Sequence, residues 1–349
     1  MMNPNALIPT ADALPVASWW FEGLGILTLA IHLVMVNVLV GGSLIALYVA
    51  LTDRQNPVVK SVSDKLPTIF ALTVNFGVAP LLFLQVVHGQ FFYTSATMSA
   101  VWWLGIVLLL IGGYYAMYVN QYRQGKSPMK APLFLAAGLV MVLCISVVLT
   151  SVMTTVENPE LWIKYFTNAN GTVLNLFETT TVPRYLHFLL ACLAIGGLFV
   201  ALLASYGRLD DKAGTMGIKV FTTTTLLQMA TGLWWLMALE RPVLLQFMGD
   251  NPLATALLLV AVGLTFPALI AGFSNKPRSA AVWTGLTVLA MVGLRATVRA
   301  LTLKPYFSSA NLPVTGEYTP LVLFLVTLAA GLILVGYMLK LALKPQREG

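Results

Sequence analysis

The stretch AIHLVMVNVLVGGSLIALYVAL (Ala30–Leu51) decides the fold of this chain, because it contains no Asp, Glu, Lys or Arg. A helix of about 20 apolar residues crosses roughly 30 Å of hydrocarbon. In lipid, every main-chain polar group of such a segment must be paired internally, which a helix achieves. The stretch therefore predicts a transmembrane helix.

The rest of the chain has the same character. Of its 349 residues 58% are hydrophobic and 9% are charged, which is more apolar than a soluble domain. A transmembrane barrel would instead show ten-residue segments of alternating hydropathy, so we expect an all-α membrane protein. Nine spans are predicted, near residues 18–51, 67–90, 101–119, 133–154, 185–206, 219–239, 253–274, 280–301 and 319–341.

The basic residues predict the orientation of these spans. Fourteen of the twenty Lys and Arg residues lie in the loops and tail at one end of the spans. The positive-inside rule places that end in the cytoplasm, so the N-terminus is expected outside and the C-terminus inside. The net charge of +7 then reflects topology, and no nucleic-acid partner is expected.

An internal repeat divides the chain. IHLVMVNVLVGG (Ile31–Gly42) and LHFLLACLAIGG (Leu186–Gly197) both read H-x8-G-G, at an offset of 155 residues, and at this offset Gly77 falls on Gly232 and Asn120 on Asn275. This order favours a duplication. The predicted organisation is a four-helix unit (1–155), an external loop (156–184), a second four-helix unit (185–305), and a last part (306–349) with a loop, the ninth helix and a cytoplasmic tail.

The three histidines of the chain are candidate ligands. His32 is 22 residues from Arg54, His88 is 23 from Lys65 and His187 is 21 from Arg208. At 1.5 Å per residue, each count gives roughly 31–35 Å above the cytoplasmic boundary, near the outer interface. We therefore expect one common level, with His32 and His88 close together because they lie on consecutive antiparallel helices.

Haem iron is the leading ligand hypothesis for histidines at a common depth in a helix bundle. Zinc is disfavoured because no carboxylate lies deep in any span. A single interfacial histidine more often bonds a carbonyl or caps a helix, and that reading stays open for His88. For His32 and His187, the matching repeat positions favour ligation of metal.

Other candidates lie near the same level. Arg295 and Arg299 share one face of the eighth span, and Arg184 precedes His187 by one turn. They are predicted to pair with haem propionates or a quinone oxygen, or else to snorkel to lipid headgroups. Met248 is a possible thioether ligand. The two cysteines, Cys144 and Cys192, lie in apolar spans and are expected to be buried small side chains.

AIHLVMVNVLVGGSLIALYVAL, NFGVAPLLFLQ (Asn75–Gln85) and LHFLLACLAIGG together resemble subunit I of the cytochrome bd quinol oxidases. The resemblance implies an external N-terminus, two four-helix bundles plus one helix, and haems near the outer face. By resemblance, His32 matches the histidine of the high-spin haem pair and His187 the ligand of the low-spin haem.

The chain also departs from that family. Only Glu240 to Pro252 stands where the family has its long quinol-binding loop, and the family's intramembrane glutamates on the third and eighth helices have no counterpart. We therefore expect a b-type cytochrome subunit of a bacterial inner-membrane complex, containing one or more haems b. It would exchange electrons between quinone and a periplasmic c-type cytochrome or iron–sulfur subunit, without reducing oxygen.

Two further interpretations stay open. One is a haem-free membrane anchor or assembly subunit of a respiratory complex. The other, which the sequence favours less, is a transporter. For docking of a partner, the external loop 156–184 is the expected surface because it is the longest connection and includes Glu157, Glu160 and Glu178.

Overall fold

The computed structural model describes residues 4–126 and 129–342, and the long elements in these ranges are all α-helices. In chain order the elements are η1 (Pro4–Leu7), α1 (Ser18–Thr52), α2 (Pro57–Ser63), α3 (Leu66–Met98), α4 (Ala100–Lys126), α5 (Ala131–Glu157), η2 (Pro159–Phe166), α6 (Thr181–Ser205), α7 (Asp211–Met237), α8 (Arg241–Leu245), η3 (Gln246–Asp250), α9 (Pro252–Gly263), α10 (Thr265–Phe273), α11 (Pro277–Leu303), η4 (Ser309–Asn311) and α12 (Thr319–Ala342).

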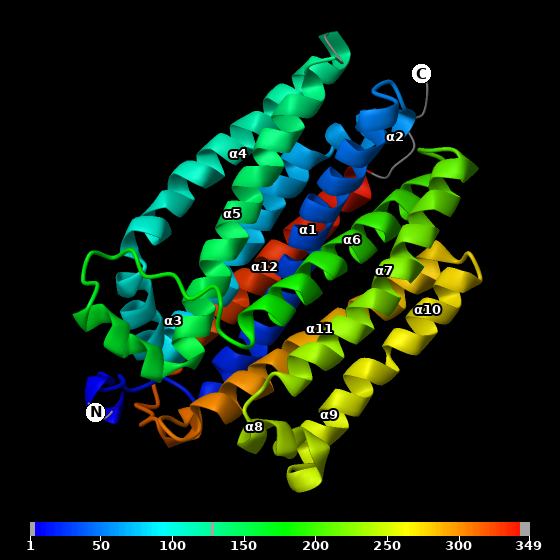
Figure 1. Cartoon of the computed structure of the whole chain (residues 1–349). Coiled ribbons are helices and arrows are strands. Elements are labelled where there is room, and N and C mark those ends of the chain that lie inside the picture. Colours follow the sequence, from blue (N-terminus) through cyan, green and yellow to red (C-terminus); the bar gives the residue numbers. More distant parts are fainter. Residues whose placement is uncertain (1–3, 127–128, 343–349) are drawn as a thin grey trace.

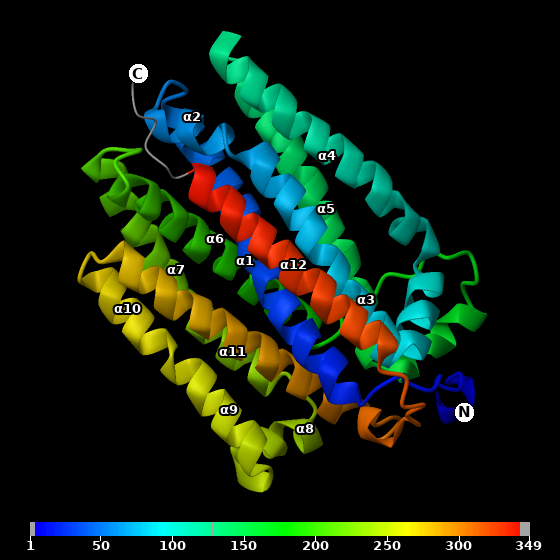
Figure 2. The same ribbon diagram turned by 180° about the vertical axis from the view of Figure 1, so that it is seen from behind.

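The long helices other than α12 run side by side in one elongated bundle (Figures 1 and 2). The connections 158–180 and 304–318 lie at one end, which we call the loop end. The connections 53–65, 206–210 and 274–276 lie at the opposite end, which we call the basic end because most of the Lys and Arg residues flank it.

Among the described residues, seven helical segments are long and apolar enough to cross a membrane, which confirms the expected all-α membrane class. They are Ser18–Thr52, Pro57–Met98, Ala100–Lys126, Ala131–Glu157, Thr181–Ser205, Pro252–Phe273 and Pro277–Leu303. The sixth predicted span corresponds to α7, which lies beside α6 along its length. It is less apolar than the seven because it carries Thr222–Thr225 and Gln228 on its 27 residues.

The two repeats meet at the centre of the bundle, where α1 packs against α6. A Cβ atom placed on Gly41 would lie 1.7 Å from the main-chain oxygen of Cys192, and one on Gly196 would lie 2.6 Å from the Cα atom of Gly41. Only glycine permits so close an approach of two helix backbones. Gly41 and Gly196 are themselves 155 residues apart, so equivalent residues face each other across this contact, as at a two-fold interface.

The match between Asn120 and Asn275 in sequence does not extend to their positions in the structure. Asn120 lies inside α4, which continues to Lys126, whereas Asn275 follows the end of α10 with a positive φ of 52°. The predicted seventh span, 253–274, is divided into α9 and α10 at Leu264. These differences show that the third helices of the two units have diverged.

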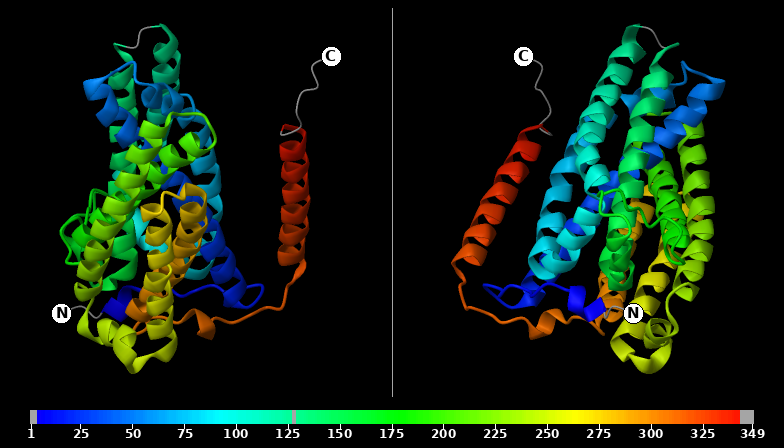
Figure 3. Two further views of the ribbon diagram at one scale, coloured as in Figure 1. Left: turned by 90° about the vertical axis from the view of Figure 1, so that its right-hand side faces the viewer. Right: turned by 60° about the vertical axis from the view of Figure 1, so that its left-hand side comes forward.

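Helix α12 stands apart from the other helices in both views of Figure 3. Its connection to the bundle is nevertheless fixed: the N–H of Leu14 donates to the carbonyl of Pro313 at 2.8 Å, and the N–H of Thr315 donates to the carbonyl of Leu14 at 2.9 Å. The ring of Phe324 contacts that of Phe83 on α3, with centroids 5.8 Å apart.

Candidate cofactor site

His32 lies in the interface between α1 and α3. Its Nδ1 donates to the main-chain carbonyl of Thr73 at 2.9 Å. The ring lies against Gly77, where an added Cβ would be 2.8 Å from the ring Cε1. Because a carbonyl only accepts hydrogen bonds, the proton of the neutral imidazole is on Nδ1 and the Nε2 lone pair is left for another partner.

His187 repeats this arrangement between α6 and α7. Its Nδ1 donates to the carbonyl of Gln228 at 3.1 Å, and a Cβ on Gly232 would lie 3.1 Å from the ring Cε1. Thr73 and Gln228 are also 155 residues apart, so the carbonyl acceptor, the histidine and the glycine all recur at the offset of the repeat. One difference is that the Gln228 side-chain amide lies 3.3 Å from Nε2 of His187 and donates to it.

His88 does not join His32, in contrast to the expectation of one common level. His32 contacts α3 at Thr73 and Gly77, whereas His88 is eleven residues farther along α3, which corresponds to about 16 Å of helix axis. The residue count placed His32 too far above the cytoplasmic boundary, because α1 has 35 residues and is longer than a membrane is thick.

The surroundings of His88 are different from those of the other two. Its backbone departs from helical geometry at φ −125° and ψ 30°, directly before Gly89. The side chain is 5% exposed, and its ring lies 5.6 Å from that of Phe307. Its Nδ1 has no hydrogen-bond partner within the described ranges.

The predicted arginines gather around Glu157, at the end of α5. The guanidinium of Arg184 pairs with the carboxylate of Glu157 at 2.5 Å and lies 5.4 Å above the ring of Trp235. The ring of Trp235 in turn lies 6.1 Å from that of His187. Arg295 and Arg299, on α11, are within electrostatic reach of Glu157.

Other predicted residues lie elsewhere. Met248 is 53% exposed in the short π-helix η3. Cys192 is buried as expected, but Cys144 is exposed on the side of the bundle, because α5 turns it away from its neighbours. Two hollows at the basic end are lined by residues within 211–220 and by residues within 57–65 together with Arg208, and they include none of the predicted site residues.

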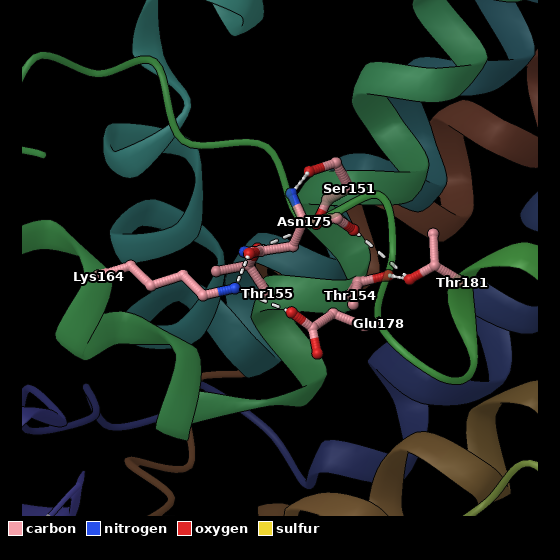
Figure 4. Close-up of polar contacts among 7 residues, drawn as sticks. All are labelled: Ser151, Thr154, Thr155, Lys164, Asn175, Glu178 and Thr181. Carbon is pink, nitrogen blue, oxygen red and sulfur yellow. Dashed lines mark hydrogen bonds and ion pairs between the residues drawn. The ribbon is translucent and has the colours of Figure 1, made fainter.

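The connection between α5 and α6 is held against the end of α5 by a polar network (Figure 4). The main-chain N–H of Asn175 donates to Ser151 Oγ at 2.7 Å, and its side-chain amide donates to Thr155 Oγ1 at 2.7 Å. Lys164 Nζ donates to Asn175 Oδ1 at 2.7 Å and to Glu178 Oε1 at 2.9 Å. The loop is therefore an ordered cap on the bundle.

Sequence reasoning missed three members of this site: Glu157, Trp235 and Gln228. Glu157 was expected on the docking surface, but it is the last residue of α5 and is only 8% exposed. Gln228 could have been found from the repeat, since it lies 41 residues after His187 as Thr73 lies 41 after His32. Within the described ranges, no three His, Cys, Asp or Glu side chains surround one point, so the three histidines do not form a single metal centre.

Comparison with known proteins identifies no relative: no family model, no curated protein and no solved structure matches the chain.

Proposed function

We propose that this protein is a membrane-embedded b-type cytochrome subunit, similar to subunit I of the cytochrome bd quinol oxidases. It exchanges electrons between the quinone pool and a periplasmic redox partner, and it does not reduce oxygen. The observation that carries the proposal is the pair of matched histidines, each with Nδ1 anchored to a main-chain carbonyl and the ring seated on a glycine.

These residues fit haem. Histidine ligands of metals are usually oriented by a hydrogen bond from the second ring nitrogen, and here that bond fixes the tautomer that leaves Nε2 free of hydrogen. His32 and His187 would hold the iron of separate haems, because they lie in different helix interfaces. Haem supplies one-electron transfer when bound. The chain's residues supply orientation, and Gln228 would have to release Nε2 of His187.

The proposal includes a topology. All nine predicted spans cross the bacterial inner membrane, with α7 and α12 added to the seven apolar segments. The basic end then faces the cytoplasm, because short cytoplasmic loops are rich in Lys and Arg. The loop end, to which the His187 interface between α6 and α7 lies nearer than to the basic end, faces the periplasmic partner.

A haem-free membrane anchor or assembly subunit is the alternative. It is favoured by one observation: both ring nitrogens of His187 already have hydrogen-bond partners, Gln228 supplying both its carbonyl and its side-chain amide. In that case the histidines are interhelical bonds, which are common in membrane bundles.

A reduced-minus-oxidised visible spectrum of the purified protein distinguishes the two. The cytochrome proposal predicts sharp b-type bands that decrease in His32→Ala and in His187→Ala. Met248→Ala is the control, because this exposed side chain is expected to leave the bands unchanged. A flat spectrum from folded, full-length protein would refute the cytochrome. Oxidation of a quinol analogue by an artificial acceptor, without oxygen uptake, would separate a quinol dehydrogenase from an oxidase.

A further inference from the structure

A group of buried charges lies around Glu157 at the loop end, and one of its members, Arg184, is one helical turn from His187 on α6. Arg184 and Glu157 form an ion pair whose side chains are only 11% and 10% exposed. Arg295 is within electrostatic reach of Glu157, Arg184 and Arg299, and Arg299 is within reach of Glu157 and Glu22. We call Arg184, Arg295, Arg299, Glu157 and Trp235 the arginine cluster.

The cluster has more hydrogen-bond donors than acceptors. Arg184 Nε and Nη1, Arg299 Nε and Trp235 Nε1 are all buried without a partner among the described residues. The Nδ1 atom of His88, near Arg299, is also unpartnered in a side chain that is 5% exposed. A buried donor without an acceptor destabilises the protein, and it does so more strongly when it is charged. The number of buried donors without a partner in this cluster indicates that a hydrogen-bond acceptor binds there.

The charge balance points the same way. Three guanidinium groups are close to two carboxylates, Glu157 and Glu22, and one oxygen of Glu22 already accepts from Ser309 Oγ at 2.5 Å. One positive charge is therefore left without a counter-ion among the residues that the structure describes. Arginine inside a membrane bundle is expensive unless it is paired.

The cluster is not required by the fold. In the first repeat, Leu29 stands at the position of Arg184 and Pro80 at the position of Trp235, at the same offset of 155 residues. The backbone arrangement around His32 nevertheless matches that around His187. Arg184 and Trp235 are therefore features of the second unit alone, and they give its histidine a neighbourhood that the first lacks.

We propose that the arginine cluster is an oxyanion-binding site that takes one carboxylate or phosphate group next to His187. The planar guanidinium donors suit either group, because both present paired oxygens. The oxyanion comes from one of two sources, a carboxylate arm of a cofactor bound at His187 or the headgroup of an anionic lipid. Only the first source rests on the proposed function.

Two binding measurements on the purified full-length protein, in a neutral detergent, test the site and identify the source. In one, tryptophan quenching compares the affinity for haem with that for its dimethyl ester, which lacks the carboxylates. In the other, the thermal midpoint is compared after addition of phosphatidylglycerol or phosphatidylcholine. We expect one of the two to prefer the anionic compound, by about tenfold in affinity or an equivalent shift of the midpoint.

The variant Arg299→Gln should remove that preference, because it takes one guanidinium group out of the arginine cluster. It leaves the Arg184–Glu157 ion pair in place. Arg241→Gln, on the exposed start of α8, is the matched control and should keep it. The proposal is overturned if neither compound pair is discriminated, or if the preference survives in Arg299→Gln. Equal binding of haem and its ester, together with equal midpoints for the two lipids and intact b-type bands, would refute the oxyanion site alone. A lipid preference in a protein that binds no haem would refute the cytochrome proposal alone and leave the oxyanion site standing.

Discussion

The thiol of Cys192 donates to the side-chain oxygen of Asn37 across 3.2 Å, and the two residues occupy the same position in the two repeats. One turn farther along each helix, Gly41 and Gly196 form a close backbone contact between α1 and α6. Self-equivalent contacts of this kind define a pseudo-two-fold axis through the bundle, as in an isologous dimer whose subunits have been joined.

The glycine contact makes the first prediction. Gly41→Ala should destabilise the protein by about 1–3 kcal/mol, because the new Cβ overlaps main-chain atoms of α6 that cannot move aside separately. Gly105→Ala, on α4, has open space around the new Cβ and should be neutral or slightly stabilising. The measurement is the apparent melting temperature in detergent, and equal midpoints for the two variants would contradict the close contact.

The glycines beneath the histidine rings make the second prediction. Gly77→Val and Gly232→Val should displace the rings of His32 and His187 and break their bonds to Thr73 and Gln228. If the histidines ligate haem, each variant should lose b-type absorbance as the corresponding histidine-to-alanine variant does. Gly285→Val, on an exposed face of α11, should retain the spectrum. Full absorbance in both ring-displacing variants would argue against ligation.

The buried ion pair makes the third. Glu157→Gln leaves the Arg184 guanidinium without its carboxylate in a site that is about nine-tenths buried, so a loss of about 3–5 kcal/mol is expected. Glu178→Gln removes the other ion pair, in which Lys164 is 45% exposed, and should cost at most about 1 kcal/mol. Thermal unfolding of the two variants under identical conditions compares them. A smaller loss in Glu157→Gln than in Glu178→Gln would show that Arg184 does not depend on Glu157.

The loop network makes the fourth. Asn175→Ala removes the amide that joins Thr155 to Lys164, and the connection 158–180 should then open more often and be cleaved faster in limited proteolysis. Asn170→Ala is the control, because only the main-chain N–H of Asn170 is bonded, to Asn168. Unchanged cleavage in Asn175→Ala would mean that the loop is held by other contacts.

Local sequence determined the helices and the repeat. Runs such as Ala30–Leu51 have no low-energy alternative to a helix in lipid, because each main-chain polar group must be paired within the segment. The H-x8-G-G pattern also placed His32 and His187 in equivalent positions, and the offset of Gly77 to Gly232 followed from it. These are properties of residue order, which tertiary packing does not alter.

Only the tertiary structure decided what these residues face. The tilt and rotation of each helix are set by its neighbours, so residue counts placed His88 beside His32 although about three helical turns of α3 separate them. The same packing carried Glu157 from an expected surface loop into contact with Arg184, and set α12 apart from the bundle. The position of a residue along its own helix follows from the local sequence, whereas the partner of its side chain depends on how helices far apart in sequence lie against one another.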